Sequence, residues 1–281
     1  MPITPKYWGL EVKVNAPLFY DYYGIGNRIN ISGTDDVEAQ KIRLNLFEFK
    51  PKLTFQSKSK AQRLQLQFLY QDFAFDEPSS LQDFIQMSEL KDEHIGGVNI
   101  AHEYKNLDDE VNPHRGISWK NEIGWSSSLS TENIQFFTLK TELSLFIPIR
   151  ITKNQSTLAL RTGWSNNSGR YAFYQANFLS GYDNFRGIRR NRFADKAVVY
   201  NNIDFRYNLF KVPNYIVPFN VGVFAHYDLA KVYNQSSTNP FWHQAYGAGV
   251  FVNVLDFINL VGTYSISNTD RLISVGTKFL F

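Results

Sequence analysis

The stretch "QFFTLKTELSLFIP", residues 135–148, indicates the fold of this chain. Its side chains alternate between two faces. One face carries apolar residues with a single threonine: Phe137, Leu139, Thr141, Leu143, Leu145 and Ile147. The other face carries polar and charged residues: Thr138, Lys140, Glu142 and Ser144. A period of two residues is typical of a β-strand with one apolar and one polar side.

The same period recurs along the chain and predicts about twelve strands. They cover residues 6–15, 38–56, 61–74, 94–105, 115–126, 134–148, 156–165, 197–209, 215–229, 244–254, 257–267 and 271–281. Short turns alternate with long connections, which are residues 16–37, 75–93, 166–196 and 230–243. Tight turns at one end and long loops at the other are typical of a membrane β-barrel. One short helix is expected within residues 79–93.

A soluble β-sandwich would alternate in the same way, but two features favour a membrane barrel. Opposite charges share the polar face within single strands, such as Lys120 with Glu122 and Lys140 with Glu142. Aromatic residues stand at the ends of the apolar face: Trp119, Trp125, Tyr246, Tyr264, Phe279 and Phe281. A wet interior and a lipid-facing exterior with aromatic girdles explain both. We therefore predict an all-β, antiparallel transmembrane β-barrel that forms a single domain over residues 1–281.

Other function classes find no support in the sequence. The chain has no cysteine, and its formal charge of +3 gives no general attraction to nucleic acid. Its five histidines lack paired ligand spacing, and no nucleotide-binding or nucleophile motif is present. Glu122 and Glu142 are expected to pair with Lys120, Lys140 and Arg161 across strands. We predict no catalytic residue, no metal, no cofactor and no enzyme activity.

The stretch "RLISVGTKFLF", residues 271–281, resembles the terminal strand of bacterial outer-membrane barrels. Such strands end in an aromatic residue and are read by the barrel assembly machinery. One face of the predicted strand carries Ile273, Val275, Thr277, Phe279 and Phe281. We therefore expect these five residues to form an assembly signal, with that machinery as a partner.

The segment "FLSGYDNFRGIRRNRFADKAVVYNNIDFRYNLF", residues 178–210, resembles the bacterial surface antigen family of BamA-type outer-membrane assembly and secretion barrels. The family's loop motif corresponds to Phe185, Arg186, Gly187 and Ile188, with Ser180 and Gly181 in place of a glycine pair. Two further elements correspond to Asp204-Phe205 and Tyr227-Asp228-Leu229-Ala230. The resemblance implies that loop 166–196 folds into the lumen and that Arg186 reaches Asp204, Asp228 or both. A buried guanidinium needs carboxylate partners of this kind.

The stretches "YYGIGN" (22–27) and "NPHRG" (112–116) resemble elements of the subfamily fused to calcineurin-like phosphoesterases. The resemblance implies a role in outer-membrane protein assembly or protein translocation, in the outer membrane of a Gram-negative bacterium. Expected partners are outer-membrane lipid, lipopolysaccharide and unfolded outer-membrane or secreted proteins, with no nucleic acid. A passive porin and a structural membrane anchor are the alternatives.

The family barrel has sixteen strands, whereas this sequence predicts about twelve. The strands without a counterpart here are the family's first four, and periplasmic POTRA repeats and a phosphoesterase module also have none. Two interpretations stay open: the chain is part of a longer barrel, or it is a compact relative.

Overall fold

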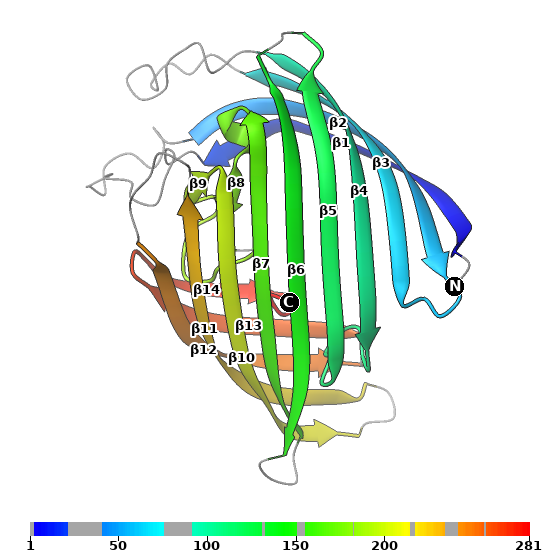
Figure 1. The fold of residues 1–281 in the computed structure, drawn as a ribbon. Helices are drawn as coiled ribbons and strands as arrows, with labels where there is room; N and C mark the ends of the chain where they lie inside the picture. The colour runs from blue at the N-terminus through cyan, green and yellow to red at the C-terminus, as the bar shows by residue number, and fades with distance from the viewer. Residues whose placement is uncertain are drawn as a thin grey trace.

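Twelve strands form one antiparallel sheet in the computed structural model of the chain (Figure 1). The structure describes residues 3–21, 41–75, 92–130, 133–150, 155–181, 183–213, 217–233, 241–255 and 257–281, with the backbone alone for residues 3–8, 13–21 and 41–43. The sheet curls around an interior space, here called the lumen. Among the described residues, no helix is long and apolar enough to cross a membrane.

Strands that follow one another in the chain are neighbours in the sheet. The strands are β1 (Ile3–Asp21), β2 (Lys41–Ser57), β3 (Gln62–Phe75), β4 (Glu93–Leu107), β5 (Gly116–Ser128), β6 (Gln135–Arg150), β7 (Gln155–Arg170), β10 (Ala197–Val212), β11 (Phe219–Tyr233), β12 (His243–Val254), β13 (Ile258–Ser267) and β14 (Arg271–Gly276). The single interruption lies between β7 and β10, which pair directly. The intervening loop holds a 3-10 turn, η3 (Phe173–Gln175), and a small hairpin of β8 (Asn177–Leu179) and β9 (Phe193–Asp195).

The alternation predicted from sequence places apolar side chains outside and polar ones inside. Large exposed apolar residues occur on most strands, among them Val12, Phe68, Ile100, Ile123, Phe137, Tyr246, Val250 and Leu260. Buried polar residues face the lumen, among them Glu48, Arg161, Asn202, Asp204, Arg206 and Asp228. An apolar exterior around a polar, charged interior suits a barrel surrounded by lipid.

The prediction of twelve antiparallel strands is confirmed, and three strands differ from it in extent by five residues or more. β7 runs to Arg170, although residues 166–170 were expected in a loop. β1 runs to Asp21, although residues 16–21 were expected in a loop. β14 ends at Gly276, although the last strand was expected to reach Phe281. The helix expected within residues 79–93 lies almost entirely outside the described residues.

Candidate functional site

The loop between β7 and β10, residues 171–196, folds against the inner face of the sheet. Its buried apolar side chains join those of β10, β11 and β12 in one cluster, which contains Leu179, Phe185, Ile188, Phe193, Val198, Ala230, Val232 and Ala245. The η3 turn packs elsewhere, in a cluster with strands β2, β3, β4 and β6, through Phe173 and Tyr174. Since the η3 turn and the later part of the loop pack against different parts of the sheet, the loop spans the lumen.

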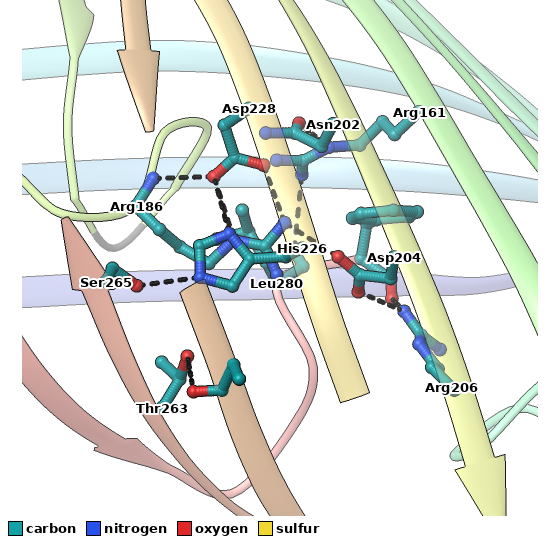
Figure 2. A network of polar contacts seen from close by, with 12 residues as sticks. Arg161, Arg186, Asn202, Asp204, Arg206, His226, Asp228, Thr263, Ser265 and Leu280 are labelled. Atoms are coloured by element: carbon teal, nitrogen blue, oxygen red, sulfur yellow. Dashed lines mark hydrogen bonds and ion pairs between the residues drawn. The ribbon is translucent and has the colours of Figure 1, made fainter. Parts of the chain in front are cut away.

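Arg186 lies in this loop and meets two carboxylates from neighbouring strands (Figure 2). Its Nε and Nη2 donate to the two oxygens of Asp228 at 2.8 and 2.6 Å, and its backbone N–H donates to Asp228 at 3.0 Å. Its Nη2 also lies 2.7 Å from Oδ1 of Asp204. This bidentate geometry uses the planar fork that guanidinium offers and ammonium does not.

Water is almost excluded from these charges, since Arg186 is 5% exposed and both aspartates are 0% exposed. Burial by itself would lower the pKa of Arg186, but the carboxylates of Asp204 and Asp228 outweigh burial and raise this pKa. The arginine therefore stays charged. A charge buried at this depth is tolerated only when its partners are in place.

Gly187 allows the loop to approach β13 closely. Its φ of +75° lies in the region that residues with a side chain rarely adopt. A Cβ at this position would lie 3.3 and 3.4 Å from the Cβ atoms of Ser265 and Ser267. The Gly187 carbonyl accepts a hydrogen bond from the Ser267 hydroxyl at 2.6 Å.

Replacing Gly187 with alanine is expected to lower the free energy of unfolding by about 1–3 kcal/mol, because alanine is strained at positive φ. The melting temperature in detergent measures this effect. Gly276→Ala is the control, since the nearest atom to its added Cβ lies 3.6 Å away. Equal losses of melting temperature in Gly187→Ala and Gly276→Ala would contradict the conclusion that Gly187 is needed for its positive φ.

Two further buried arginines belong to the site, and sequence reasoning did not assign them this role. Arg206, on β10, donates to Asp204 at 3.0 Å and to the backbone oxygen of Phe281 at 2.9 Å. Arg161, on β7, donates to the backbone oxygens of Asp183 at 3.1 Å and Leu280 at 3.2 Å. Arg206 thus links Phe281 to Asp204, and Arg161 links Leu280 to the loop residue Asp183. Arg206 could have been found from the sequence, because it stands two residues after Asp204 and so shares the inward face of the same strand.

Residues 277–281 leave the sheet and enter the lumen, contrary to the single apolar face expected over 273–281. Ile273 and Val275 are 78% and 80% exposed on the outside, and Thr277 is exposed, whereas Phe279 is 4% exposed. Phe279 packs in an apolar cluster with Phe224, Phe251 and Val261, which point inward. The Arg206 guanidinium lies 3.8 Å from the Phe279 ring centroid. This aromatic and cationic environment competes with strand pairing for the segment.

Ser265, His226 and Asp228 have the composition of a catalytic triad but not its geometry. His226 Nε2 lies 2.9 Å from the Ser265 hydroxyl, whereas its Nδ1 lies 3.8 Å from Asp228, which is bound by Arg186. Ser265 is 0% exposed. A nucleophile needs a base oriented by a third group and access to substrate. These three residues therefore lack the orientation and the access that a catalytic triad requires.

Other charged residues singled out in the sequence do not contact Arg186, Asp204 or Asp228 in the contacts described, although Glu142 reaches the site through Arg161. Glu142 pairs with Lys120 at 3.0 Å and Arg161 at 3.5 Å, and Glu122 lies 3.9 Å from Lys140, as expected. Arg189 and Arg190 are exposed on the loop. Among the described residues, no group of three or more His, Cys, Asp or Glu side chains could hold a metal ion.

Comparisons with known proteins show which family and which solved structures this chain resembles. The model of the Omp85 superfamily domain matches residues 4–256. No curated protein matches the chain. Among solved structures, the crystal structure of BamA from Haemophilus ducreyi lacking POTRA domains 1–3 is similar, with a TM-score of 0.65 at 13% sequence identity. The match covers 98% of this chain but 59% of that one, so the chain spans less than two thirds of the BamA structure's length. The chain belongs to the Omp85 superfamily.

Proposed function

We propose that this chain is the membrane-embedded part of a protein that assembles or translocates other proteins at the bacterial outer membrane. The observation that carries the proposal is the Arg186 centre, which holds a long loop inside the lumen through Asp204 and Asp228. Family membership supports the same role. In this proposal, the four residues from Phe185 to Ile188 form a lock that keeps the loop folded inward.

The contents of the lumen support this role over a passive porin. A porin needs an open aqueous passage, whereas here loop 171–196 and residues 277–281 both lie inside the sheet. A structural anchor would need no buried ionic centre, because such a centre adds little to stability compared with apolar packing. We also propose that the partners are lipid, lipopolysaccharide and unfolded outer-membrane or secreted proteins, and that the chain is not an enzyme. The assembly signal over residues 273–281 stays a prediction.

The function is tested by reconstitution in liposomes. A urea-unfolded outer-membrane barrel is added, and its folding is followed by heat-modifiable gel mobility. Liposomes that carry the chain should fold this client faster than empty liposomes, and Arg186→Ala should reduce the gain. Solute flux is measured on the same vesicles. Solute flux without accelerated folding would support the porin. The absence of both solute flux and accelerated folding would support the structural anchor.

A further inference from the structure

The turn between β4 and β5, residues 108–115 and here called the flap, is internally ordered. The Asp108 carboxylate accepts three backbone N–H bonds from within the flap at 2.9–3.0 Å. The Asp109 carboxylate accepts two more at 2.7 and 2.8 Å. Aspartate oxygens that replace backbone partners in this way fix the shape of a turn. The flap therefore behaves as one preformed unit.

The flap reaches across the lumen to distant strands. Its Val111 carbonyl accepts a 2.7 Å hydrogen bond from Asn259 of β13. Its His114 Nδ1 lies 2.7 Å from the Thr157 hydroxyl of β7. In the sheet, the strands β6, β7, β10, β11 and β12 stand between β5 and β13. A turn bonded across five strands of a curled sheet lies over the opening rather than along its rim.

Two cavities, each of about 390 Å³, adjoin the flap. The first is lined by Val111 and Pro113 together with Arg161 and residues 278–281. The second is lined by other flap residues, Asn112 and His114 among them, together with Asn253 of β12. Asn112 is 4% exposed. Because different residues of the flap line the two cavities, the flap divides the space within the sheet.

We propose that residues 108–115 close the lumen at the end opposite loop 171–196, with the Asn259 side chain as the latch. Successive strands are antiparallel, so the turn after β4 and the loop after β7 lie at opposite ends of the sheet. Any solute or chain that passes this end of the lumen requires the flap to swing away from β13. The inference concerns closure alone and stands whatever substrate the protein takes.

Cross-linking tests the position of the flap. The chain has no native cysteine, so introduced thiols have no background. In Val111→Cys/Asn259→Cys, a short bifunctional thiol reagent should join the two residues within one folded chain, which alters gel mobility. The control pair is Val111→Cys/Leu260→Cys, because the Leu260 side chain is 48% exposed on the outer face. Equal cross-linking of both pairs overturns the proposal. So does the absence of cross-linking in the test pair when each single thiol still reacts with a monofunctional reagent.

Thiol labelling tests the latch. The reporter is Ser144→Cys, since Ser144 is 5% exposed and lines the first cavity. Adding Asn259→Ala should raise its labelling rate by about tenfold, as expected for the loss of about 1.4 kcal/mol of closure. Asn253→Ala is the matched control, because Asn253 is also buried, at 3% exposed against 0% for Asn259, and lines the second cavity. Unchanged labelling, or an equal rise in the control, overturns the proposal, provided that heat-modifiable mobility is retained in all variants.

Discussion

Arg186→Ala is expected to lower the free energy of unfolding by about 3–5 kcal/mol, the typical loss when one partner of a buried ion pair is removed. The centre contains two arginines, Arg186 and Arg206, and two aspartates, Asp204 and Asp228, all within the lumen. Without Arg186, the one possible cation near Asp228 among the described residues is His226, at 3.8 Å. Its 0% exposure leaves the carboxylate no access to water. The midpoint of thermal unfolding in detergent measures the loss.

Two controls separate the lock from general effects. Arg190→Ala removes an exposed arginine of the same loop and should change stability by less than about 0.5 kcal/mol. The triple variant Arg186→Ala/Asp204→Asn/Asp228→Asn should cost less than the sum of its parts, because coupled partners are not additive. If Arg186→Ala leaves stability and loop protease resistance unchanged, the centre does not hold the loop.

Much of this structure could be predicted because it depends on which residues of a strand alternate to the outer face and which to the inner face. A period of two residues assigns each strand and its faces without knowledge of its neighbours. The same phase placed Asp204 and Asp228 on the inward side, and the loop resemblance pointed Arg186 toward them. The structure brings all three together at 2.6–2.7 Å.

Contacts between distant segments could not be predicted in this way. Alternation continues through Phe279 and Phe281, so local phase predicts a strand over 271–281. Residues 277–281 instead enter the lumen, where Phe224 and Phe251 lie on an otherwise polar face of the sheet. Those two inward aromatic residues indicate that an apolar segment packs inside the lumen. The sequence around each of them does not indicate which segment this is. The hydrogen bond between Val111 and Asn259 could not be predicted for the same reason, because the two residues lie 148 residues apart in the sequence.

Arg206→Ala is expected to release residues 277–281 from the lumen. The substitution removes the guanidinium 3.8 Å from the Phe279 ring and its 2.9 Å bond to the Phe281 backbone oxygen. A desolvated cation–π contact and a charged hydrogen bond together contribute about 3 kcal/mol to docking. That loss corresponds to about a hundredfold larger population of the undocked segment.

Limited trypsin digestion measures this release, because Lys278 is exposed whereas Phe279, on the other side of the cleaved bond, is 4% exposed. Cleavage after Lys278 should accelerate about a hundredfold in Arg206→Ala, since proteolysis follows the open population when opening is fast. Lys140→Ala is the control, because Lys140 is another lumenal cation and its ion-pair partner, Glu122 at 3.9 Å, belongs neither to the Arg186 centre nor to residues 277–281. Arg186→Ala should accelerate the cut less than Arg206→Ala, since Arg186 reaches the segment only through the shared carboxylate of Asp204. An unchanged rate in Arg206→Ala would mean that the apolar cluster around Phe279 holds the segment without the arginine.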